Sequence, residues 1–179
     1  SKSSLLKSVS IALKAVPSKT TMPILECILM DATTNQIKFT TNDMELGIET
    51  IVEGTIEEKG KVALDAKSFY EIIRRLPDND VTIKTDDKYA ATITCEKAKF
   101  NIPGKSGEDF AYLPMIEKDE PLTISQYTLK EMIRQTIFSI AVNENNKLMT
   151  GELFEIKNNC LKVVSLDGHR ISIRKMSLK

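Results

Sequence analysis

The sequence predicts an α+β fold in which a β-α-β-β-β unit recurs, with helices on one face and antiparallel sheets on the other. Segments with helical periodicity begin near Ser4, Ala66 and Tyr127, so they recur about every 60 residues, a spacing typical of repeated architecture. Each segment is followed by stretches of alternating apolar and polar residues, separated by short turn sequences. Two such units side by side would form an ordinary α+β domain.

The first unit begins with a helix rather than a strand. Residues 4–16 predict this helix because apolar side chains recur on one side of it (Leu5, Leu6, Val9, Leu13 and Val16). Strands are predicted over residues 24–32, 36–41 and 46–54. Because the opening strand is missing here and the third unit has no fourth beside it, we expect both ends of the sequence to be cut.

The second unit contains every element of the pattern. A strand over 61–64 leads to a helix over 66–76, for which Asp65 is a good N-cap. Pro77 ends the helix, since the residue before a proline avoids the helical region. Three strands complete the unit, over residues 80–85, 89–95 and 97–102.

The third unit repeats the order. A strand over 121–125 precedes a helix over 126–141 capped by Ser125. Strands follow over residues 151–157, 160–166 and 169–176, with turns at Asn158–Asn159 and Asp167–Gly168. Between the second and third units, residues 102–114 contain two prolines and two glycines and are predicted to be a linker. The expected domains are therefore residues 1–115 and 116–179, the latter being half of a domain.

Composition excludes several classes of protein. The 179 residues carry 25 basic and 25 acidic side chains, so the total charge does not indicate nucleic-acid binding, and only the placement of cations could. No apolar run is long enough to cross a membrane and no signal peptide is visible. Three separated cysteines (Cys27, Cys95 and Cys160) indicate reduced thiols in a cytoplasmic protein, and with a single histidine they form no metal site.

Basic residues share one face of each predicted helix. They are spaced four or seven apart, away from the apolar stripe, as Lys7 and Lys14, as Lys67 and Arg74 with Arg75 beside it, and as Lys130 and Arg134. One interpretation is a solvated helix face, interrupted by Glu71 and Glu131. The other is a set of helices that present cations to phosphates, which would hold a duplex without reading its sequence.

Two segments could carry chemistry. Asp43 and Glu45 would share a face of a strand, as an acid–base or metal pair requires, although a turn explains them equally. Asp167 could orient His169 as a base, but no nucleophile is placed by a motif, and Asp-Gly between alternating strands predicts a hairpin. An enzyme with a site at Asp43 and Glu45 and a general protein-interaction module therefore both stay open.

Several stretches resemble the bacterial DNA sliding clamps, in the same order along the chain. They are "KTTMPILECIL", "TTNDMELGI", "EIIRRLPD", "FNIPGKSGEDFAYLP", "MIRQTIFSIAVNENNKLMTGELFE" and "VVSLDGHRISI". The resemblance implies a non-catalytic processivity factor without cofactor or metal, which closes head to tail with a second copy into a ring around double-stranded DNA. It also implies docking by the DNA polymerase III alpha subunit, the clamp loader and other proteins that share a short motif.

The resemblance assigns three groups of residues. With the helix cations named above, Lys19, Arg74, Asn143 and Lys147 would contact DNA. One side of the peptide pocket would be formed by Met149, Leu166, Gly168, His169, Arg170 and Ile171. The subunit interface would include Lys97, Lys99, Phe100 and Ile102.

Overall fold

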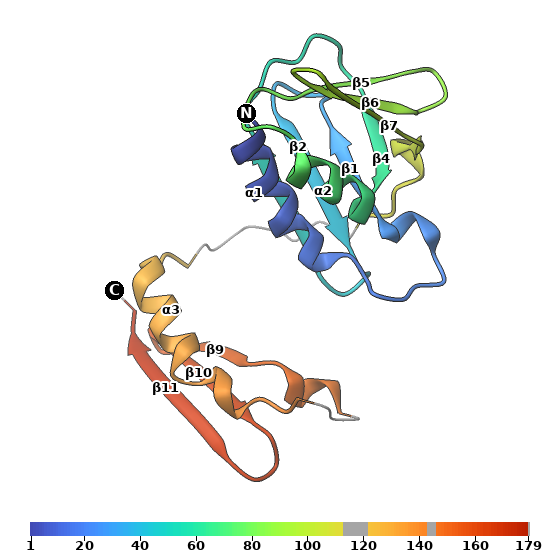
Figure 1. Cartoon of the computed structure of the whole chain (residues 1–179). Helices are drawn as coiled ribbons and strands as arrows, with labels where there is room; N and C mark the ends of the chain where they lie inside the picture. Colours follow the sequence, from blue (N-terminus) through green and yellow to red (C-terminus); the bar gives the residue numbers. More distant parts are fainter. Residues whose placement is uncertain (113–121, 143–145, 179) are drawn as a thin grey trace. The chain divides into compact units, whose positions relative to one another are not determined.

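The computed structural model describes residues 1–112, 122–142 and 146–178 and divides into two compact units, residues 1–116 and 117–179 (Figure 1). The predicted α+β class is confirmed, because every strand pair is antiparallel and the helices lie against the sheets. We call residues 1–116 unit 1 and residues 117–179 unit 2.

Unit 1 opens with helix α1 (Lys2–Ala12), which continues into the 3₁₀ turn η1 (Leu13–Ala15). A second 3₁₀ turn, η2 (Pro23–Glu26), occupies the start of the strand predicted over 24–32, so that strand begins only at Cys27. Strands β1 (Cys27–Asp31), β2 (Ile37–Asn42) and β3 (Gly47–Val52) follow. Helix α1 packs on β2 and β3.

The opening strand of the second repeat joins the sheet of the first. Strand β4 (Lys61–Asp65) pairs with β1, with Cys27 opposite Asp65, and the sheet order is β3-β2-β1-β4-β8. Strands β5 (Thr82–Thr85), β6 (Ala91–Cys95) and β7 (Ala98–Ile102) form a separate three-stranded sheet. The predicted order of elements is therefore right, but the strands of one repeat are shared between two sheets.

Helix α2 (Ala66–Arg75) matches its prediction closely. The Asp65 carboxylate accepts a hydrogen bond of 2.8 Å from the Ser68 N–H, which satisfies a helix N-terminal donor. Both helices and both sheets of unit 1 contribute to one core, whose fully buried members include Val9, Phe39, Leu64, Phe69, Ile73 and Ile93. Phe39 and Phe69 meet in it with ring centroids 6.0 Å apart.

The linker predicted over residues 102–114 is wrong for its first part. Residues Gly104–Ser106 form strand β8, which pairs with β4. Phe110 is buried with Cys27 and Leu29 on the other face of the five-stranded sheet. The Asn42 side-chain amide donates a 2.6 Å hydrogen bond to the Ala111 carbonyl oxygen. Proline and glycine indicated a break in regular structure here, but pairing and burial fix the segment to unit 1.

Unit 2 contains helix α3 (Gln126–Arg134) and the antiparallel strands β9 (Leu153–Lys157), β10 (Cys160–Leu166) and β11 (Ile171–Ser177). Ser125 caps α3 as predicted, accepting from the Thr128 N–H at 3.1 Å. The strand predicted over 121–125 is not formed by its described residues, 122–125. Leu161 and Val163 of β10 and Met132 of α3 form the small core.

The helix predicted to reach residue 141 ends at Arg134. Thr136 is fully buried, and its hydroxyl contacts the Met132 carbonyl at 2.8 Å and the Glu152 carboxylate at 2.5 Å. The chain then continues as the 3₁₀ turn η4 (Ile137–Ser139). Apolar spacing continues past the end of α3, which is why the sequence pattern overestimated its length.

Candidate nucleic-acid interface and peptide-docking surface

The cations of the first repeat lie on the solvent side of α1 and beyond its end. The helix buries Leu5, Val9 and Ala12, while Lys7 is exposed. Lys14 is exposed in η1, and Lys19 is exposed in the loop that follows. None of these three lysines has an ion-pair partner within the described residues. Their ammonium groups therefore point into solvent.

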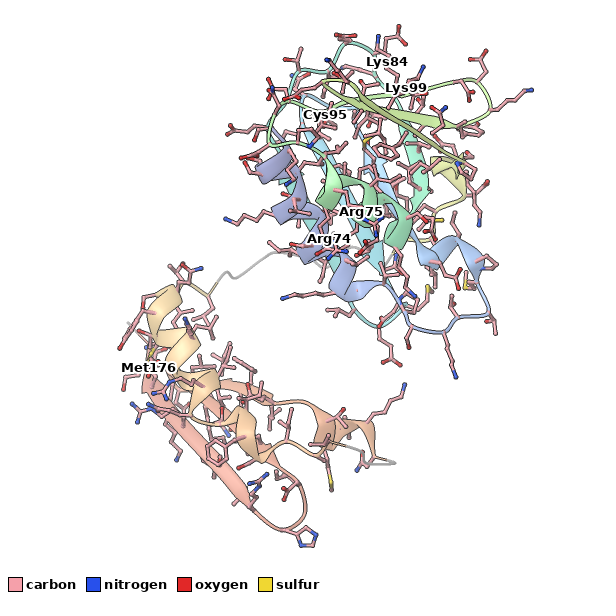
Figure 2. The ribbon with its side chains drawn as sticks, in the orientation of Figure 1. Arg74, Arg75, Lys84, Cys95, Lys99 and Met176 are labelled. Atoms are coloured by element: carbon pink, nitrogen blue, oxygen red, sulfur yellow. The ribbon has the colours of Figure 1, made fainter. Side chains whose placement is uncertain are left out.

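The cations of α2 are organised by a carboxylate. One Glu71 oxygen lies 2.7 Å from a terminal nitrogen of Arg74 and 3.4 Å from one of Arg75. The hydrogen bond that Arg74 donates to Glu71 is the main reason why the pKa of Arg74 is raised. Figure 2 shows both arginines at the C-terminal end of α2, which packs against α1. Exposed pairs of this kind are weak, so a phosphate could replace the carboxylate.

Helix α3 repeats this arrangement in unit 2. The Glu131 carboxylate accepts from Arg134 Nε at 3.0 Å and from a terminal nitrogen at 2.8 Å, and these bonds lower the pKa of Glu131. Lys130 is exposed beside this pair. Lys147 is exposed in the 3₁₀ turn η5 (Lys147–Thr150), while Asn143 lies outside the described residues.

The Asp167–Arg170 segment forms the tight turn between β10 and β11. The Asp167 N–H donates to the Arg170 carbonyl at 3.3 Å. Gly168 has a φ of 85°, and a Cβ at this position would meet no atom within 4 Å. Glycine is therefore favoured by the backbone conformation of the turn and not by a lack of space. The hairpin predicted from Asp-Gly is confirmed.

Asp167 organises the turn electrostatically. One carboxylate oxygen accepts the N–H groups of His169 and Arg170, both at 3.0 Å, and the other accepts from Arg170 Nε at 2.9 Å. The bond from the His169 N–H is the largest cause of the lowered pKa of Asp167, and together these bonds outweigh desolvation. The carboxylate is thus committed to the turn, which argues against its acting as the orienter of a catalytic histidine.

Side chains of the hairpin divide between the two faces of the sheet. Leu166 and Ile171 are register partners, so they share a face, and they are 36% and 59% exposed. Arg170 immediately precedes Ile171 and therefore belongs to the opposite face. His169 is exposed at the turn. Met149 is half-buried in η5, where its carbonyl accepts from the Ala141 N–H at 2.9 Å.

Sequence reasoning missed Phe138, which contacts the hairpin. The ring belongs to η4, is 59% exposed, and has the guanidinium carbon of Arg170 over it at 5.9 Å from the ring centroid. No local signal could have identified this residue, because it was counted within the predicted helix and outside its apolar stripe. The contact joins residues from separate elements.

The predicted subunit-interface residues lie on strand β7 or directly before it, and β7 is an edge strand of its sheet in the described structure. Lys97 and Lys99 are exposed and Phe100 is 39% exposed. Ile102, in contrast, is 8% exposed and belongs to the core of unit 1. Phe100 and the backbone edge are therefore available to a partner, whereas the Ile102 side chain is not.

The remaining candidate chemistry is absent from the described residues. Asp43 is a turn residue, since its carboxylate accepts the N–H groups of Glu45 at 3.0 Å and Leu46 at 2.7 Å. Within the same part of the chain, no three His, Cys, Asp or Glu side chains could hold a metal ion. A cleft of about 720 Å³ lies along β5 and the 53–60 loop, and none of the predicted site residues, no histidine and no cysteine line it.

Comparisons with known proteins show the family to which the chain belongs. A family model described as the DNA polymerase III beta subunit, N-terminal domain, matches residues 1–114, and the central-domain model of the same subunit matches residues 123–179. The chain belongs to the DNA polymerase III beta subunit family, the bacterial sliding clamps. The family resemblance of the sequence motifs is thereby confirmed.

Individual relatives cover the same region. The chain is 35% identical to the beta sliding clamp of Bacillus subtilis, over 99% of this chain and 49% of that protein. A crystal structure of a DNA polymerase III beta subunit from Eubacterium rectale is 68% identical with a TM-score of 0.93, covering 100% of this chain and 49% of that one. The B. subtilis clamp structure gives a TM-score of 0.91 at 35% identity, over 99% of this chain and 49% of that one. The chain thus spans about half the length of these clamps.

Among residues 1–112, 122–142 and 146–178, no helix is long and apolar enough to cross a bilayer.

Proposed function

We propose that this chain forms the first domain and half of the second domain of a DNA sliding clamp, with residues 1–115 and 116–179 as the two parts. The clamp would be a non-catalytic processivity factor in the cytoplasm, encircling duplex DNA and tethering the replicative polymerase. The observation that carries the proposal is the order of the two family matches, N-terminal domain before central domain, along the chain.

The exposed helix cations support a sequence-independent contact with DNA. Phosphates are uniform along a duplex, so lysine and arginine contacts hold it without selecting a sequence. A closed ring stays on DNA by its topology, and its contacts can be weak enough for sliding. This agrees with a chain whose net charge is zero.

The 166–171 hairpin supports a docking function. It carries exposed apolar side chains (Leu166 and Ile171) on one face and, beside the turn, Arg170 anchored to Asp167 on the other. Such a mixed surface suits short peptides with aliphatic or aromatic anchors. The alpha subunit of DNA polymerase III, the clamp loader and other motif-bearing proteins are the proposed partners. Tethering would raise the local concentration of polymerase at the primer end.

The exposed edge of β7 supports head-to-tail closure with a second copy. An edge strand offers unpaired N–H and C=O groups, and Phe100 adds a partly exposed aromatic ring. In this proposal the edge pairs with another subunit in the complete clamp.

The test uses the complete clamp, loaded onto primed DNA by its loader. Replacing Lys7 and Lys14 by alanine should shorten polymerase products, because two phosphate contacts per subunit are lost. The slope of log affinity against log salt should fall by roughly 0.9 for each lost contact. Lys59→Ala with Lys84→Ala is the matched control, since both lysines are exposed in unit 1 but lie on the 53–60 loop and the three-stranded sheet.

Two results would contradict the proposal. A loaded wild-type protein that leaves product length unchanged would exclude a processivity factor. An equal change of salt slope in the control variant would exclude the helix faces as the DNA contact.

A further inference from the structure

The Arg170 side chain contacts Asp167 and Phe138, and the rest of its guanidinium group is exposed to solvent. Its Nε donates to Asp167 at 2.9 Å, and its guanidinium carbon lies 5.9 Å from the centroid of the Phe138 ring. This distance falls within the range of about 6 Å over which a cation is attracted to an aromatic face. The two terminal nitrogens have no hydrogen-bond partner among residues 1–112, 122–142 and 146–178, and the side chain is 57% exposed.

Phe138 is exposed on a segment that is itself fixed. It lies outside the core of unit 2, so packing does not account for a large ring at this position. On its C-terminal side, the hydroxyl of Ser139, which is 1% exposed, lies 2.6 Å from that of Ser172. On its N-terminal side, the buried Ser165 hydroxyl donates to the Thr136 carbonyl.

These bonds tie η4 to the two strands that the hairpin joins. Ser165 of β10 and Ser172 of β11 are register partners on the face that carries α3. Asp167 and Arg170 form the next pair along that face, because the intervening Leu166 and Ile171 point the other way. Phe138 and Arg170 therefore approach one another from the same side, and the position of the ring is set by buried hydroxyl contacts.

We propose that Phe138 is a positioning residue for peptide docking. Its ring holds the Arg170 guanidinium so that the terminal N–H groups face a carbonyl or carboxylate oxygen of the bound peptide. An arginine oriented in advance loses less freedom on binding than one that samples many rotamers. The inference rests on the proposed function, in which the 166–171 hairpin docks short peptides.

The experiment measures the affinity of the complete clamp for a fluorescein-labelled peptide that carries the clamp-binding segment of the polymerase alpha subunit. Phe138→Leu removes the aromatic face and should weaken binding roughly two- to fivefold, the effect of losing a cation–aromatic contact at an exposed site. Phe138→Tyr keeps the aromatic ring and should bind the peptide with wild-type affinity. Ile137→Val is the matched control, since Ile137 is 44% exposed in the same turn and is not the ring beneath Arg170.

A second background separates positioning from a merely structural role. With Arg170→Ala already present, Phe138→Leu should cause no further loss of affinity, because no guanidinium remains to be oriented. An additional loss in that background would overturn the inference, since Phe138 would then act without Arg170. Thermal melts of each variant confirm that binding is measured on folded protein.

Different outcomes would contradict the positioning role of Phe138 and the docking of peptides. Equal affinity of the wild type and Phe138→Leu would overturn the positioning role while leaving peptide docking intact. Absence of any peptide binding by the wild-type clamp would overturn the docking proposal itself.

Discussion

The turns at residues 43–46 and 167–170 have the same backbone hydrogen bonds and different side chains. In each, the first residue donates its N–H to the carbonyl of the fourth, at 3.1 Å in the first turn and 3.3 Å in the second. In each, the carboxylate of Asp43 or Asp167 accepts the N–H groups of the third and fourth residues. The same turn is thus built in both units, and only the second presents an arginine and a histidine.

The two turns differ in the backbone strain at their second residue. Met44 has a φ of 76° and Gly168 a φ of 85°, a region that side chains other than glycine adopt with strain. Unit 1 tolerates that strain, whereas unit 2 avoids it. The comparison shows that the hydrogen bonds accepted by the Asp side chain define the turn, while glycine at the second position relieves the backbone strain.

The units also share a link between helix and sheet. In unit 1 the buried Thr41 hydroxyl donates to the Ala12 carbonyl at the end of α1. In unit 2 the Ser165 hydroxyl donates to the Thr136 carbonyl just beyond α3. Each bond adds a side-chain donor from the sheet to the carbonyl oxygen that begins a 3₁₀ turn, and so links the end of the helical segment to a strand.

The units differ most in their cores. Unit 1 encloses its core between two helices and two sheets. In unit 2, Phe154 and Ile156 face the same side as the buried Val163 and Leu161, yet they are 44% and 58% exposed. One repeat has too little surface to cover its own sheet.

The largest expected effect tests how completely each unit encloses its core. Phe69→Ala should destabilise unit 1 by about 3–5 kcal/mol, because a fully enclosed ring leaves a cavity that cannot collapse. Leu161→Ala should destabilise unit 2 by about 2–3 kcal/mol, since the neighbouring open face can relax. Hydrogen exchange of the whole chain, resolved by segment, measures both; a larger loss in unit 2 would refute the comparison.

The next effect tests the two turns. Gly168→Ala should destabilise unit 2 by about 1–2 kcal/mol, because alanine is strained at this positive φ. Gly151→Ala is the matched control, since a Cβ there also meets nothing within 4 Å and the backbone is extended, with φ −125°. Urea denaturation followed in unit 2 provides the measurement.

The reciprocal change completes that test. Met44→Gly should stabilise unit 1 by up to about 1 kcal/mol relative to Met44→Ala, which removes the side chain but keeps the strain. Equal stability of the glycine and alanine variants would show that strain does not distinguish the turns.

The smallest effect concerns pH. The folded pKa of Asp167 is lowered, so its contribution to stability is present above the unfolded pKa of about 3.9 and is lost as pH falls through the lower folded value. In Arg170→Ala the pKa should stay below the ordinary value, because the His169 N–H is its largest cause. Carboxyl titration by NMR checks both; an ordinary or raised midpoint would contradict the assignment.

Local signals predicted some elements almost to the residue. Asp65 and Pro77 bracket α2, and Asp167–Gly168 indicates the hairpin, because capping and turn chemistry depend on neighbours in sequence. The end of α3 was missed because Thr136 leaves the helical pattern to bond Glu152, a residue from another part of the chain. Strand β8 was missed because its pairing with β4 overrides a sequence rich in glycine.

The sequence by itself determined the repeat, the helix caps, the cationic helix faces and the 166–171 hairpin. Tertiary structure alone decided that β4 crosses into the neighbouring repeat's sheet and that Phe138 lies beneath Arg170. Periodicity and turn chemistry act between residues close in the chain, and a sequence records them directly. Sheet order and contacts between separate elements depend on which surfaces bury one another, and that choice is made only when the whole unit packs.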